Sequence, residues 1–82
     1  MITDIRQTEF EISPRFRRTI EQRIAVLEAN AEHDESRVPQ LDSPDHIRRQ
    51  LRLVAAQRAE ALRMRLFLDR AGIRCSRLLP LH

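Results

Sequence analysis

Two Ser-Pro dipeptides, each followed by apolar residues at helical spacing, constrain the fold of this chain more than any other feature. They occur in the stretches ISPRFRRTI and DSPDHIRRQL. A serine at the N-cap accepts a hydrogen bond from an otherwise unpaired amide, and a proline at the first helical position has no amide to leave unpaired. Ser13-Pro14 and Ser43-Pro44 therefore predict the starts of two helices.

The spacing of apolar residues sets the expected length of each helix. Behind the first Ser-Pro they recur every three or four residues and predict a helix over 14–32. The polar stretch that follows contains Pro39 and predicts a non-helical loop over 33–43. Behind the second Ser-Pro a seven-residue recurrence predicts a helix over 44–71. We expect Gly72 to end it in the left-handed conformation and to begin a tail over 72–82.

The segment QTEFEIS alternates polar and apolar residues, which predicts a strand over 7–13. A lone strand is unstable, so we expect it to pair with the same strand of a second copy. The predicted fold is a single, mainly α domain over 1–82, with a short N-terminal strand, two helices and a homodimeric assembly. The residues expected in the core or dimer interface are Phe10, Ile12, Phe16, Ile20, Ile24, Leu27, Ile47, Leu51 and Val54.

Composition supports a small helical protein that needs a partner. The chain has 82 residues, 41% of them hydrophobic and 33% charged, with one glycine. A chain this short buries little core by itself. The single cysteine, Cys75, excludes an internal disulfide, and no apolar run approaches membrane-spanning length. We therefore expect a cytoplasmic protein without membrane association. No cofactor, metal site or enzymatic activity is expected, because no nucleophile, ligand set or phosphate loop has suitable spacing.

The distribution of charge favours an anionic partner. All fifteen basic residues are arginine. Residues 1–44 hold six arginines and nine acids, whereas residues 45–82 hold nine arginines and three acids. A basic half suits nucleic acid, a membrane surface or an acidic protein. At helical spacing, one face of the second helix carries Arg48, Arg49, Arg52, Arg63 and Arg70, which form either a binding strip or a solvated surface.

Two arginines interrupt the apolar seam of the second helix. Arg58 and Arg65 occupy positions that a regular coiled coil would fill with leucine. A buried arginine is costly without a partner, so we expect ion pairs there. Asp69, Glu21 and Glu28 are the candidate partners.

The order of strand, Ser-Pro helix start and second helix resembles the ribbon-helix-helix DNA-binding proteins, and among them the ParD-type antitoxins. The matching residues are Phe10, Ile12, Ser13, Pro14, Phe16, Ile20, Ile24 and the stretch IRRQLRLV over 47–54. The resemblance covers roughly residues 8–32 and 43–58. It implies an antitoxin-like transcriptional repressor: a dimer whose paired strands enter the DNA major groove and whose C-terminal half binds a toxin-like protein.

Two sets of site residues are expected. At nucleic acid, the resemblance implies Gln7, Glu9, Glu11 and Ser43, and the arginine strip adds Arg48, Arg49 and Arg52. Those expected at a partner protein are Arg58, Leu62, Arg65, Leu66 and Phe67. An alternative with the same fold is a helical interaction or dimerisation module without nucleic-acid binding. It is favoured by Glu9 and Glu11, since carboxylates facing a polyanion are unfavourable.

Overall fold

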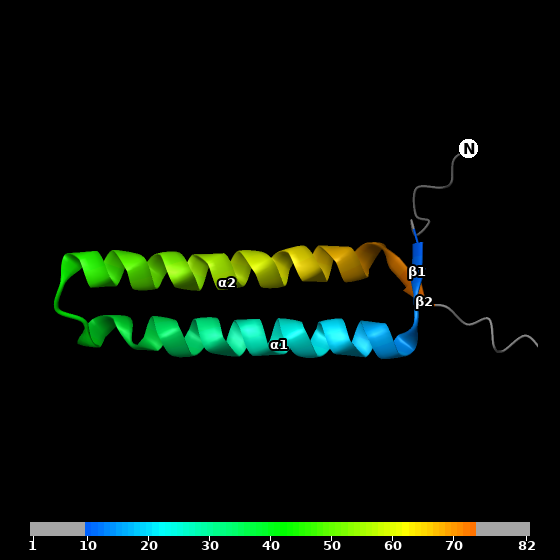
Figure 1. Cartoon of the computed structure of the whole chain (residues 1–82), viewed down its shortest axis with the longest axis horizontal. Helices are drawn as coiled ribbons and strands as arrows, with labels where there is room; N and C mark the ends of the chain where they lie inside the picture. Colours follow the sequence, from blue (N-terminus) through cyan, green and yellow to red (C-terminus); the bar gives the residue numbers. More distant parts are fainter. Residues whose placement is uncertain (1–9, 74–82) are drawn as a thin grey trace, which may run out of the picture.

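The computed structural model describes residues 10–73 as an antiparallel helical hairpin (Figure 1). Its two long helices lie side by side, and two short strands cross the open end of the hairpin beside each other. The elements in chain order are β1 (Phe10–Ile12), α1 (Pro14–Ser36), the 3-10 helix η2 (Val38–Gln40), α2 (Pro44–Arg70) and β2 (Ala71–Ile73). The described part of the chain is therefore mainly helical, with a short strand ahead of the first helix, as predicted.

Both predicted helix starts are confirmed. The Ser13 hydroxyl accepts a hydrogen bond from the Phe16 amide at 3.0 Å, and α1 begins at Pro14. The Ser43 hydroxyl accepts one from the Asp45 amide at 3.2 Å. Both serines have extended backbones, as N-cap residues do. The two Ser-Pro dipeptides thus act as local signals that need no distant contact.

The end of α1 and the connection to α2 differ from the prediction. The first helix continues to Ser36 rather than to residue 32. The polar stretch after residue 32 has no glycine or proline before Pro39, so nothing in it stops the helix. Pro39 then lies in the first turn of η2, where its missing amide costs no hydrogen bond. The loop expected over 33–43 is therefore shorter and contains one turn of 3-10 helix.

The end of α2 corrects two further predictions. Ala71 caps the helix with φ −88° and ψ 136°, and Gly72 lies in β2 instead of forming a left-handed cap. β2 pairs in parallel with β1, Glu11 standing opposite Gly72. The partner strand of β1 thus comes from the same chain, and the prediction that it must come from a second copy is wrong. The hairpin itself is the long crossover that parallel pairing requires.

The core is a narrow seam between α1 and α2. Its buried residues are Ile12, Ile24, Leu27, Ala31, Val54, Ala61, Leu68 and Ala71. Of the other predicted core residues, Phe10, Ile20 and Ile47 are half-buried, whereas Phe16 and Leu51 are exposed. The reason is geometric: the hairpin is 12 Å thick, the diameter of one helix. Any apolar arc wider than the seam remains at the surface of the chain.

Candidate protein-interaction surfaces

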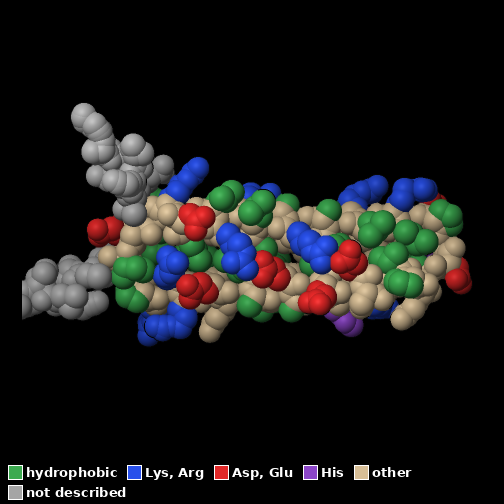
Figure 2. All heavy atoms as spheres, turned by 180° about the vertical axis from the view of Figure 1, so that it is seen from behind, with side chains coloured by type: hydrophobic (Ala, Val, Ile, Leu, Met, Phe, Trp, Pro, Cys, Tyr) green, Lys and Arg blue, Asp and Glu red, His purple; other side chains and the backbone are tan. Residues whose placement is uncertain are grey.

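One side of the seam carries a row of ion pairs, which we call the ion-paired face (Figure 2). Arg65 binds Glu28 of α1 through Nε at 2.9 Å and Nη2 at 2.8 Å. Two turns of α2 towards the loop end, Arg58 Nη2 donates to Glu35 Oε1 at 2.8 Å. The expectation of ion pairs is confirmed: of the three candidate partners Glu28 is the one that binds Arg65, whereas Glu35, the partner of Arg58, was not among them. Because these side chains are about half exposed, the two arginines flank the seam and are not buried in it, contrary to the prediction.

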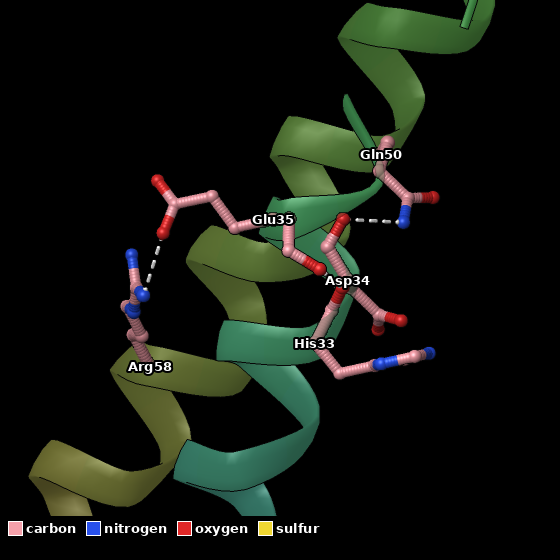
Figure 3. A network of polar contacts seen from close by, with 6 residues as sticks. His33, Asp34, Glu35, Gln50 and Arg58 are labelled. Carbon is pink, nitrogen blue, oxygen red and sulfur yellow. Dashed lines mark hydrogen bonds and ion pairs between the residues drawn. The ribbon is translucent and has the colours of Figure 1, made fainter. Parts of the chain in front are cut away.

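The two helices also cap each other. Gln50 of α2 donates from Nε2 to the carbonyl oxygen of Asp34, in the last turn of α1, at 2.8 Å (Figure 3). At the open end, Arg17 of α1 donates from Nη1 to the carbonyl oxygen of Leu68, in the last turn of α2, at 3.5 Å. Each carbonyl also accepts a bond from the cap residue of its own helix, Arg37 at Asp34 and Ala71 at Leu68, so the side chains add a second bond at each helix end. They fix the register of the hairpin at both ends.

Two shallow grooves run along the ion-paired face, with volumes of about 450 and 410 Å³. Arg65 and Glu28 line both of them. These two groups already bind each other, so the polar lining is largely committed to contacts within the chain. In residues 10–73 no three His, Cys, Asp or Glu side chains come together in a way that would hold a metal ion. The charged groups of the ion-paired face therefore mainly align α1 with α2.

The other side of the seam is apolar at the open end. The Phe10 and Phe67 rings lie 4.9 Å apart, and Phe16 meets Phe67 edge-on at 6.3 Å. Ile20 and Met64 lie beside the core at the same end and are partly buried. We call Phe10, Phe16, Ile20, Met64 and Phe67 the aromatic face. Contacts between aromatic rings contribute about 0.5–1.5 kcal/mol and typically occur in buried sites. Here both rings remain at the surface, since Phe16 is 45% exposed and Phe67 is 36% exposed.

A third surface of α2 begins beside the ion-paired face, where Leu62 also lines the second groove, and continues onto the outer side of the helix. Leu51, Leu62 and Leu66 are all exposed, and helical spacing puts them in one row beside the predicted arginine strip. Figure 2 shows hydrophobic and arginine side chains following one another along the edge that α2 forms. Two of the arginines make contacts within α2, Arg48 with Asp45 and Arg63 with Glu60. We call this combined surface the basic ridge; its members are the three leucines and the arginine strip, Arg48, Arg49, Arg52, Arg63 and Arg70.

The residues predicted to contact nucleic acid do not form one site in the chain. Gln7 and Glu9 lie outside the described residues, and Glu11 is exposed at the open end. Ser43, the N-cap of α2, lies at the opposite end, with Arg48, Arg49 and Arg52 in the first three turns after it. α1 separates the two groups by 23 residues, which is about 34 Å of helix. The described members of this set therefore lie at opposite ends of the hairpin, and nucleic-acid binding by them stays a prediction.

The predicted partner-binding residues are likewise divided among surfaces. Arg58 and Arg65 bind acids of α1 on the ion-paired face. Leu62 and Leu66 lie on the basic ridge, and Phe67 belongs to the aromatic face. These five residues span three sides of one helix, so no single partner helix covers them all. Their order along the sequence did not reveal this, because neighbours in a helix point about 100° apart.

Sequence reasoning missed Gln50, Gln57 and Arg17 as seam residues. Gln50 and Gln57 are half-buried and continue the three-and-four spacing of the apolar positions in α2. Arg17 stands three residues before Ile20, in the same register of α1. The signal was present in the spacing, but polar residues at these positions were not counted. The side-chain oxygen of Gln57 is buried without a hydrogen-bond partner.

In comparisons with known proteins, no family model matches the chain, and neither the curated proteins nor the solved structures contain a significant match. Neither α1 nor α2 combines the length and apolar character needed to cross a bilayer.

Proposed function

We propose that the chain is a helical protein-interaction module that self-associates through its aromatic face. The observation that carries this proposal is the exposure of Phe16 and Phe67, which touch each other at the surface of a hairpin with a very small core. Contiguous exposed apolar side chains on a soluble protein mark an interaction site. A second layer that covers this face would supply the burial that one layer of two helices lacks.

A second copy of the chain fits this face better than a charged partner does. The five members of the aromatic face are uncharged, so two copies related by a two-fold axis meet there without repulsion between like charges. The same arrangement keeps the ion pairs Glu28–Arg65 and Glu35–Arg58 in solvent, on the other side of the seam. Two hairpins stacked in this way form a four-helix bundle, a common solution for amphipathic helices.

Removal of the aromatic rings tests the proposal. Phe16→Ala and Phe67→Ala are each expected to raise the dimer dissociation constant at least about 30-fold, the effect of a central interface residue worth 2 kcal/mol or more. Light scattering during size-exclusion chromatography measures the mass at each concentration. Leu62→Ala, an exposed apolar residue on the other side of α2, is the matched control and should leave the dimer intact. Equal effects of all three changes would contradict the proposal.

A second candidate function is the antitoxin-like, DNA-binding repressor that the resemblance implies. It is favoured by the position of Arg48, Arg49 and Arg52 within three turns of the Ser43 cap, since arginines near a helix N-terminus are suited to phosphate. A gel-shift titration with duplex DNA from its own promoter tests it. A specific site with a steep salt dependence would support the repressor, whereas no binding at low salt would leave the interaction module alone.

A further inference from the structure

The basic ridge is not needed to hold the hairpin together. Leu51, Leu62 and Leu66 do not belong to the buried core, and each remains about half exposed. Within residues 10–73, no ion pair joins Arg52 or Arg70 to an acid. The pairs that Arg48 and Arg63 do make are with exposed acids one turn away, which contribute little. This surface is therefore available to a partner.

The spacing of its leucines matches one helix. Leu51 and Leu62 are eleven residues apart, which is three turns, and Leu66 follows one turn later. The row is about 22 Å long at 1.5 Å per residue. Amphipathic helices dock through apolar anchors at this kind of spacing. A flat row of three leucines is thus the right length for a partner helix of four or five turns.

The charge of the ridge defines the chemistry of that partner. α2 carries seven arginines and three acids, so a second copy of α2 would be repelled from this side. An acidic helix would instead find arginines alongside the leucine row. Nucleic acid would pair with the arginines but would leave Leu62 and Leu66 uncovered, since phosphates offer no apolar surface. The alternation of leucine and arginine therefore favours a protein over a polyanion.

We propose that the basic ridge binds an acidic amphipathic helix of a different protein, whose apolar side chains contact Leu51, Leu62 and Leu66 and whose carboxylates pair with Arg52 and Arg70. This interaction goes beyond self-association and uses a different side of α2 from the aromatic face. The dimer would present two such ridges. Loss of the dimer and loss of helix binding are therefore separable outcomes.

The test uses the full chain and a designed probe. The probe is a fluorescein-labelled 18-residue helix with leucines spaced as in the ridge and glutamates at the flanking positions. A matched peptide carries lysine in place of each glutamate. Fluorescence anisotropy measures the binding of both peptides, and light scattering reports the oligomeric state of each variant. The acidic peptide should bind and the lysine peptide should not.

Two kinds of variant locate the site. Leu62→Ala and the double change Arg52→Gln with Arg70→Gln should each weaken binding of the acidic peptide at least tenfold without altering the circular dichroism or the mass. Leu53→Ala, an exposed leucine on the other side of the same helix, and Arg18→Gln, an arginine on α1, are the matched controls and should change binding less than twofold.

Three results would overturn the proposal. The first is failure of the acidic peptide to bind at low salt. The second is binding that Leu53→Ala weakens as much as Leu62→Ala does. The third is tighter binding of a 20-base-pair duplex or of phosphatidylglycerol vesicles that depends on Arg52 and Arg70 but is unchanged in Leu62→Ala. The last result would assign the ridge to a polyanion or a membrane surface.

Discussion

The two sides of the interhelical seam differ in how their side chains are satisfied. On the ion-paired face, charged groups from α1 and α2 are paired with each other, as in Glu28–Arg65 and Glu35–Arg58. On the aromatic face, Phe16 and Phe67 contact each other and still remain at the surface. The first side is satisfied within one chain, whereas the second is satisfied only when something apolar covers it. The ion-paired face therefore needs no partner, whereas the aromatic face leaves apolar surface for a partner to cover.

The two faces therefore contribute differently to the fold: one orients the helices, and the other can stabilise them. Exposed ion pairs contribute about 0–1 kcal/mol each, so the ion-paired face aligns the helices more than it holds them together. Burial of large apolar side chains contributes more, about 1.5–3 kcal/mol for each side chain. Since few such side chains are buried in one chain, covering the exposed rings of Phe16 and Phe67 would add to its stability.

The largest expected effect concerns the seam that lies beneath both faces. Ile24→Ala should lower the free energy of unfolding by about 2–5 kcal/mol, because Ile24 is 4% exposed and its removal leaves a cavity between the helices. Urea unfolding followed by circular dichroism measures the loss. Val26→Ala, two residues away and 48% exposed, should cost less than about 1 kcal/mol. Similar losses for both changes would mean that the seam is not where the helices meet.

An intermediate effect is expected on the aromatic face. The midpoint of thermal unfolding of the unchanged chain should rise by several degrees for each tenfold increase in protein concentration, since dimer formation stabilises the folded state. In the double variant Phe16→Ala with Phe67→Ala, that dependence should disappear. Calorimetry at three concentrations measures it. A midpoint that does not depend on the concentration of the unchanged chain would contradict self-association through the aromatic face.

The smallest effect is expected on the ion-paired face. Glu28→Gln removes the carboxylate that binds Arg65 and should destabilise the fold by about 0.2–1 kcal/mol. The loss should shrink in 1 M NaCl, because salt screens exposed charges. Glu32→Gln, which removes a neighbouring acid that makes no ion pair within residues 10–73, is the control. A loss above about 2 kcal/mol would show that this face does more than align the helices.

The features predicted correctly from the sequence are those that neighbouring residues decide. The caps at Ser13 and Ser43 satisfy amides two or three residues away, so the helix starts follow directly from the Ser-Pro dipeptides. The end of α1 was predicted too early because the polar stretch after residue 32 was taken for a loop, although it has no glycine or proline before Pro39. The bond from Gln50 to the Asp34 carbonyl, sixteen residues apart, leaves little trace in the local sequence.

The partner of β1 and the division of the surfaces also depend on distant contacts. Gly72 was expected to be a left-handed cap, but the chain that leaves α2 arrives beside β1 and continues as a strand. Leu62 and Phe67 were grouped by their position in the sequence, although they lie on different sides of α2. Only the direction of the α1 contact, which tertiary packing fixes, divides that helix into seam, aromatic face and basic ridge.

The most direct test of the central claim is an isotope-filtered NMR experiment on a mixture of ¹³C-labelled and unlabelled chains. The chain contains three phenylalanines, and all of them belong to the aromatic face. The account predicts intermolecular nuclear Overhauser effects between the Phe16 and Phe67 rings of one copy and the aromatic face of the other, and none to Leu62. Intermolecular contacts at Leu62 with none at the phenylalanines, or a single chain without such contacts at millimolar concentration, would contradict it.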